Sequence, residues 1–162
     1  RIRERRRSLE ELAIELACQR MGEDEVKQLE EAQLAFREAV NKGDAMAIAE
    51  SDEAYHDIIY YGTGNARLVQ ILNNLREQFH EIIYNSTKNQ KLVQILNNLR
   101  EQMYRYRLEY IKDADKRQVL LIEHEKILKA IKGRHVAEAK EAMREHIDNQ
   151  EITVSRNIKE KE

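Results

Sequence analysis

Residues 51–56 read Ser-Asp-Glu-Ala-Tyr-His, and this stretch decides how the rest of the chain can be interpreted. Asp52 and His56 are four positions apart, so on a helix their side chains lie one above the other on the same face. Such a pair has the spacing of two metal ligands. Two later histidines, His124 and His146, each fall on the apolar stripe of a predicted helix. We therefore expect three imidazoles and one carboxylate to converge inside a helical bundle.

The composition favours an all-α fold. The chain has 162 residues, 41% apolar and 36% charged, with no proline and only five glycines, and this mix is typical of long helices with charged outer faces. A net charge of -2 gives no overall positive field that would attract nucleic acid. The single cysteine, Cys18, excludes an internal disulfide, and no apolar run approaches the roughly 20 residues of a membrane span. We expect a cytoplasmic protein without contact to a membrane.

Glycines and short polar residues mark the ends of the predicted helices. Asp44 is the expected N-cap of a helix that ends at Gly62, and Gly133 ends a later one. A polar connection is expected over residues 112–116. Periodic apolar residues predict helices that include residues 9–17, 26–40, 48–59, 68–75, 103–110, 120–131 and 136–147. The chain is therefore predicted to form one domain over residues 1–162, an antiparallel bundle of six to seven helices.

A tandem repeat interrupts this pattern. Residues 55–78 recur almost unchanged as residues 79–102, and residues 68–78 are identical to residues 92–102. Solenoids need at least three repeats, so we interpret the second copy as one helical unit added to an otherwise complete bundle. One extra helix reverses every helix after it, and the later histidines would then face the wrong way. Three arrangements avoid this: a protruding extra helix, one long helix over residues 65–110, or a domain-swapped homodimer in which two chains exchange halves.

Four segments match one known pattern: residues 6–13 (RRSLEELA), residues 52–56 (DEAYH) followed by Gly64-Asn65, residues 123–128 (EHEKIL) and residues 142–146 (AMREH). They resemble the FCD ligand-binding domain of the FadR subgroup of GntR-type transcription regulators. The resemblance implies an effector-sensing, dimerising domain that is not an enzyme. It implies that Asp52, His56, His124 and His146 bind a divalent metal such as zinc or nickel, whose open positions accept a small carboxylic acid. Arg6 matches the arginine of the family's first helix, which implies a role in effector binding.

The chain departs from this family in two ways. Such regulators carry a winged helix-turn-helix before this domain, and because nothing precedes Arg1 we expect a sensor fragment that reaches DNA only through a missing domain. The repeat makes His80 a rival ligand, because its separation from His124 is closer to the family's usual spacing than that of His56. Arg76 stands four residues before His80, where an aspartate would be needed. We therefore favour His56.

Two other functions fit parts of the sequence. Glu53-x-x-His56 and Glu77-x-x-His80 have the helical spacing found in di-iron carboxylate enzymes. That architecture also needs inward glutamates from two other helices, and the apolar stripes contain none that is clear. A bundle used for dimerisation alone, with no bound metal, would need only its apolar stripes. The sequence favours the sensor over both alternatives because three histidines and an aspartate fall on inward faces.

Overall fold

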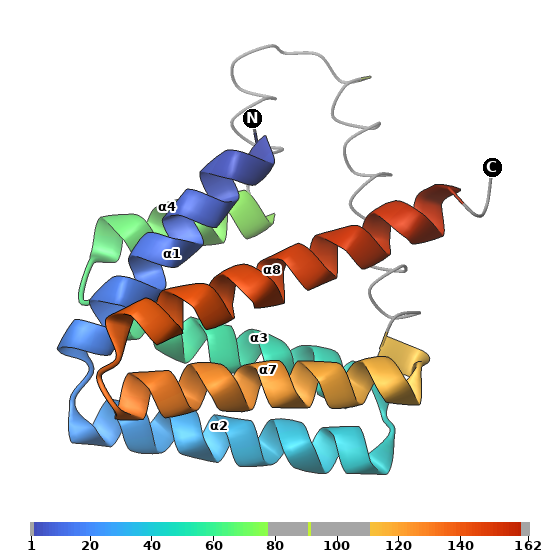
Figure 1. Ribbon diagram of the computed structural model, residues 1–162, viewed down its shortest axis with the longest axis horizontal. Coiled ribbons are helices and arrows are strands. Elements are labelled where there is room, and N and C mark those ends of the chain that lie inside the picture. Colours follow the sequence, from blue (N-terminus) through green and yellow to red (C-terminus); the bar gives the residue numbers. More distant parts are fainter. Residues whose placement is uncertain (1, 78–90, 92–110, 160–162) are drawn as a thin grey trace.

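The computed structural model describes residues 2–77, 91 and 111–159, and in this part of the chain it contains helices and no strand. The all-α prediction is confirmed. The helices are α1 (Ile2–Arg20), α2 (Glu23–Lys42), α3 (Ala45–Gly62), α4 (Ala66–Glu77), α7 (Ala114–Lys132) and α8 (Val136–Lys159). Consecutive helices joined by short turns, such as α2 and α3 or α7 and α8, run in opposite directions (Figure 1).

The helices pack so that both halves of the chain share one interior. Helix α2 packs against both α3 and α7, while α1 packs against α3, α4, α7 and α8. Helix α8 lies across α7 and runs beside α1 (Figure 1). Almost all of the second repeat copy lies outside the described residues, so the predicted long helix and the predicted exchange of halves stay predictions.

Side-chain caps begin three of the helices. Asp44 accepts hydrogen bonds from the backbone N–H groups of Met46 and Ala47, at 3.0 and 3.3 Å, as predicted for the start of α3. Asn65 caps α4 in the same way through the Leu68 N–H, at 3.0 Å. Each such cap stabilises a helix by about 1 kcal/mol. The start of α3 is thereby fixed two turns before the first proposed metal ligand.

The start of α7 differs from the prediction of a polar connection over residues 112–116. Asp113 is an N-cap, whose carboxylate accepts from the Asp115 N–H at 2.9 Å, and the helix already begins at Ala114. Charged residues in the first turn of a helix give no apolar stripe, which is why periodicity missed this turn. The aspartate is the signal that marks the true start.

The turn between α7 and α8 contains a residue in an uncommon backbone conformation. Gly133 is right-handed, and the left-handed position falls on Arg134, with φ of 57°. The Arg134 guanidinium donates to the carbonyl of Cys18 at 2.9 Å and to that of Met21. These carbonyls lie at the C-terminal end of α1, where backbone acceptors lack partners within the helix. Arg134 therefore ties the end of α1 to the turn that positions α8.

Two substitutions of Arg134 should separate the backbone strain of its left-handed conformation from the stability that its side-chain hydrogen bonds contribute. Arg134→Ala should lower the free energy of unfolding by about 1–3 kcal/mol, because two charge-assisted hydrogen bonds are lost. Arg134→Gly should lose about 1 kcal/mol less, since glycine adopts a left-handed φ without strain. Urea unfolding of both variants measures this difference. Equal stability of the two variants would contradict the strain argument.

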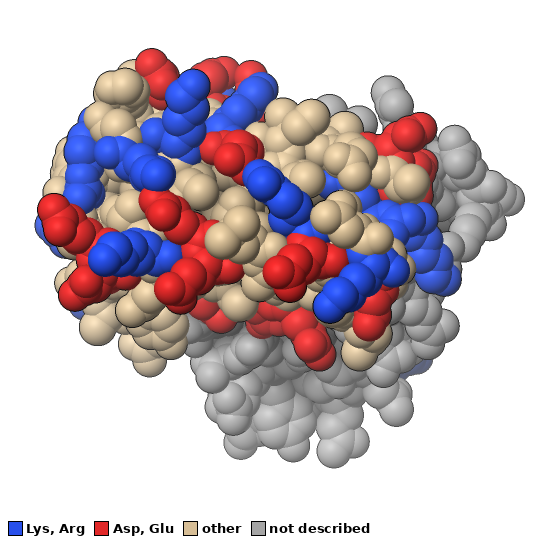
Figure 2. Space-filling model, turned by 90° about the horizontal axis from the view of Figure 1, so that it is seen from below, with Lys and Arg blue, Asp and Glu red and all other residues tan. Residues whose placement is uncertain are grey.

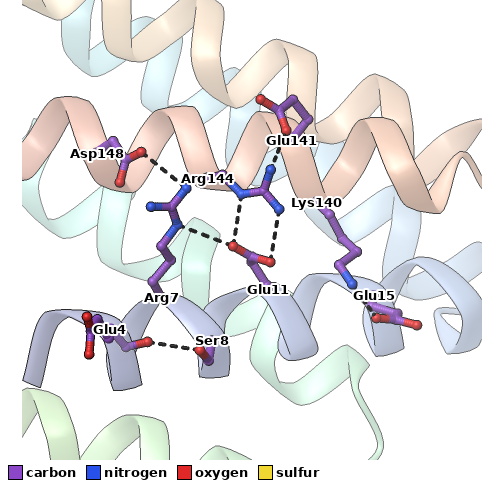
Figure 3. A network of polar contacts seen from close by, with 9 residues as sticks. All are labelled: Glu4, Arg7, Ser8, Glu11, Glu15, Lys140, Glu141, Arg144 and Asp148. Atoms are coloured by element: carbon purple, nitrogen blue, oxygen red, sulfur yellow. Dashed lines mark hydrogen bonds and ion pairs between the residues drawn. The ribbon is translucent and has the colours of Figure 1, made fainter. Parts of the chain in front are cut away.

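An ionic network joins α1 to α8 on the molecule's outer side (Figure 3). Arg144 on α8 donates to both carboxylate oxygens of Glu11, at 3.0 and 3.2 Å. Arg7 also reaches Glu11, at 3.4 Å, and Lys140 pairs with Glu15 at 2.9 Å. The hydrogen bond and the charge of Arg144 lower the pKa of Glu11, against the opposing effect of burial. The network holds the two helices side by side near the segment of α8 that carries His146.

The stability contributed by Glu11 should depend on pH. A carboxyl whose pKa is lower in the folded chain stabilises the fold above its unfolded pKa of about 4.5, and this contribution disappears as the pH falls through the folded value. Glu11→Gln should therefore be less stable than the parent chain at pH 7, and this deficit should be smaller at pH 3. Urea unfolding at both pH values tests this, with Glu31→Gln on the exposed face of α2 as control. A deficit of the same size at pH 3 would contradict the ion-pair explanation.

The surface shows charges of both signs. Figure 2 shows acidic and basic side chains interspersed over the described residues of one face. Opposite charges also pair across α2 and α7, as Arg37 does with Glu125 at 2.8 Å. Among the described residues, no helix is both long and apolar enough to span a bilayer. On this face, the distribution agrees with the expectation that the domain has no broad positive surface.

Candidate metal centre

Helix α3 supplies two of the predicted ligands. Asp52 and His56 lie one turn apart, and both are buried, with 1% and 7% of their surfaces exposed. The nearer carboxylate oxygen of Asp52 is 3.5 Å from His56 Nε2. Burial of a carboxylate is unfavourable without compensating partners, so the position of Asp52 in the interior calls for a nearby positive charge or strong donors.

Helices α7 and α8 bring the other two predicted ligands to the same place. His124 and His146 have no exposed surface. His124 Nε2 lies 3.0 Å from Asp52 Oδ1, and His146 Nε2 lies 3.1 Å from His56 Nε2. One ligand atom from each of the four residues can be chosen so that all lie within 4.8 Å of one another. The predicted convergence of three imidazoles and a carboxylate is therefore present within a single chain.

Aromatic side chains fix the plane of the His124 ring. The Tyr55 ring stacks on it with centroids 4.2 Å apart and planes 3° from parallel, and Phe36 from α2 packs against it with centroids 4.5 Å apart. The Tyr55 hydroxyl donates to the His124 carbonyl at 2.8 Å. Burial raises the pKa of Tyr55 well above its usual value, so this hydroxyl keeps its proton and stays a donor. The sequence placed Tyr55 on the inward face without revealing this supporting role.

A buried glutamate holds the His146 ring. Glu123 Oε2 lies 2.7 Å from His146 Nδ1, and Glu123 Oε1 accepts from the Asn149 side-chain amide at 2.6 Å. Desolvation lowers the pKa of His146, although its hydrogen bond with Glu123 acts in the opposite direction. The lowered pKa favours the uncharged ring, the form in which an imidazole binds a metal. Sequence reasoning missed Glu123, whose only signal was its place beside His124.

The chemistry of this donor set fits a divalent transition metal. Neutral imidazole nitrogens suit zinc, nickel, copper and iron, and a carboxylate oxygen completes the set and supplies negative charge. Four protein ligands leave two positions of an octahedral ion for other donors. The cluster lies between helices from both halves of the chain, so an ion there would bridge α3, α7 and α8.

The remaining predicted residues are placed differently. Glu53 is exposed, so the Glu53-x-x-His56 motif does not direct its carboxylate toward the imidazole as a di-iron centre would require. His80, the rival ligand, lies outside the described residues. Arg6 belongs to α1, and its side chain is likewise outside the described part, so its proposed effector contact stays a prediction. His135 is exposed and pairs with Glu138 at 3.4 Å, as expected for a surface residue.

Comparison with known proteins defines the class to which this fold and cluster belong. The sequence profile of the FCD domain matches residues 1–78 and again residues 74–149, which together span most of the chain. The chain belongs to the FCD domain family. Domains of this family are effector-binding parts of transcription regulators, and they are not enzymes.

Among solved structures, E. coli McbR/YncC has a similar fold. The superposition has a TM-score of 0.72 and a sequence identity of 16%, and it covers 96% of this chain and 67% of the other. Direct comparison with curated protein sequences gives no significant match. The first profile match ends at residue 78, where the first repeat copy ends, and the second begins within that copy's repeated half. The boundary between the two matches to the FCD profile therefore falls within the repeat.

Proposed function

We propose that this chain is the sensor domain of a GntR-type transcription regulator of the FadR subgroup, and that it binds a divalent metal and, on that metal, a small organic acid. The observation that carries the proposal is the meeting of Asp52, His56, His124 and His146 in the buried core, with ligand atoms within 4.8 Å. Three imidazole nitrogens and a carboxylate oxygen at this separation form a donor set that suits a divalent transition metal.

The acid is proposed from the coordination chemistry. Three imidazoles and one carboxylate would leave two positions on an octahedral ion, and a carboxylate or an α-hydroxy acid could fill both as a chelate. Binding would then require no bond to be broken, which suits a sensor. Because the ligands come from α3, α7 and α8, an acid seated on the metal would favour one relative placement of these helices.

A homodimer is part of the same proposal. GntR-type regulators of this kind act as dimers, and ligand binding would alter how two winged helix-turn-helix domains are held apart. The four ligands meet within one chain, so an exchange of halves is not needed to build the centre. Analytical ultracentrifugation tests the assembly, and a monomeric mass at micromolar concentration would contradict both the dimer and its domain-swapped form.

Calorimetric titration tests the sensing function directly. The chain is loaded with zinc or nickel and titrated with monocarboxylic, dicarboxylic and α-hydroxy acids, then treated with a chelator and titrated again. At least one class of acid should bind, and the chelator should abolish the heat of binding. His124→Ala should behave like the chelated chain. Failure of every acid to bind the metal-loaded protein would contradict a metal-seated effector.

A further inference from the structure

Glu123 occupies an unusual position for a charged side chain. It stands directly before His124 on α7, yet only 5% of its surface is exposed, and its carboxylate contacts α8. Both carboxylate oxygens have partners, His146 Nδ1 at 2.7 Å and the Asn149 amide at 2.6 Å. A buried carboxylate held at both oxygens has a fixed orientation, and so does the ring that it contacts.

The contact determines which nitrogen of His146 carries hydrogen. A carboxylate oxygen accepts hydrogen bonds, so the 2.7 Å contact assigns the hydrogen to Nδ1, and an uncharged ring with hydrogen there has its lone pair on Nε2. The amide of Gln150 lies 3.3 Å from His146 Nε2, and an amide nitrogen only donates, so it requires the same tautomer. Nε2 is also the atom that faces His56 Nε2 at 3.1 Å. Both neighbours therefore require the tautomer with hydrogen on Nδ1 and the lone pair on Nε2.

We propose that Glu123, braced by Asn149, is a positioning residue that keeps His146 in the Nδ1–H tautomer, so that Nε2 is available as a ligand. The inference rests on the proposed function for its effect on metal binding, while the tautomer is a property of the metal-free chain. Outer partners of this kind typically alter metal affinity by about ten- to a hundred-fold.

Nuclear magnetic resonance of the chelator-treated parent chain tests the tautomer. Long-range proton–nitrogen correlations should show His146 Nδ1 protonated and Nε2 unprotonated at pH 7.5. The opposite assignment would overturn the proposal. Because this measurement needs neither a variant nor a metal, its outcome stands even if the chain binds no metal, a result that would instead contradict the proposed function.

Metal affinity of matched variants provides the second test. Glu123→Gln keeps the shape of the side chain but removes its charge, and it should weaken zinc binding about ten- to a hundred-fold in competition with a chromogenic chelator. Glu125→Gln is the control, because Glu125 is exposed on the same helix and pairs with Arg37. It should bind zinc as the parent chain does. An unchanged affinity in Glu123→Gln, or an equal loss in Glu125→Gln, would overturn the positioning role.

Discussion

His124→Ala is expected to reduce the affinity for zinc or nickel by at least about a hundred-fold, because removal of a direct ligand should exceed the effect of removing an outer partner. His124 Nε2 lies 3.0 Å from Asp52 Oδ1 and the ring has no exposed surface, so the substitution removes a nitrogen donor from the buried cluster itself. Metal content after dialysis and competition with a chromogenic chelator measure the loss.

Two further variants guard against an effect of misfolding. His135→Ala removes an exposed imidazole and should leave metal binding unchanged. Asp52→Asn keeps the size of the side chain and should weaken metal binding, because it removes the negative charge of the proposed ligand. Circular dichroism should show helical spectra for all three variants. Full metal binding by a well-folded His124→Ala chain would show that the ion lies elsewhere.

Removing the metal should lower the melting temperature by about 8–16 °C. At a free metal concentration of about a thousand times Kd, binding to the folded state alone stabilises it by about 4 kcal/mol. For a chain of this length, 1 kcal/mol corresponds to about 2–4 °C. Scanning calorimetry with excess zinc and with excess chelator measures the shift.

The same scans on His124→Ala provide the control for this shift. The variant lacks one of the four ligands, so zinc and chelator should give nearly the same melting temperature. If the parent chain has the same melting temperature with zinc and with chelator, no metal is bound in the core. An ion held by α3, α7 and α8 would stabilise the association of these helices.

The meeting of Asp52, His56, His124 and His146 could be predicted because their positions follow helical periodicity. Asp52, His56, His124 and His146 are polar residues on otherwise apolar stripes. This departure from the apolar pattern can be recognised in the sequence alone. Glu123 could not be found in this way. A charged residue beside a stripe is ordinarily assigned to solvent, and only the contact with His146 across the α7–α8 interface reveals that it is buried.

The fold was predictable to a similar extent. Gly43, Gly62 and Gly133 mark helix ends in the structure as in the sequence. The left-handed residue after Gly133 was not predictable, because arginine has no preference for that conformation and adopts it here through its bonds to the end of α1. The direction of the helices after the repeat also needed the structure, since counting helices suggested a reversal that would separate the histidines.

The long separation between the proposed ligands along the chain has a consequence for biosynthesis. His56 and His146, whose imidazole nitrogens lie 3.1 Å apart, are ninety positions apart in sequence. A polypeptide still emerging from the ribosome therefore exposes the first two donors well before the last one leaves the exit tunnel. An ion held by all four proposed ligands could therefore be captured only after the segment that forms α8 has been synthesised.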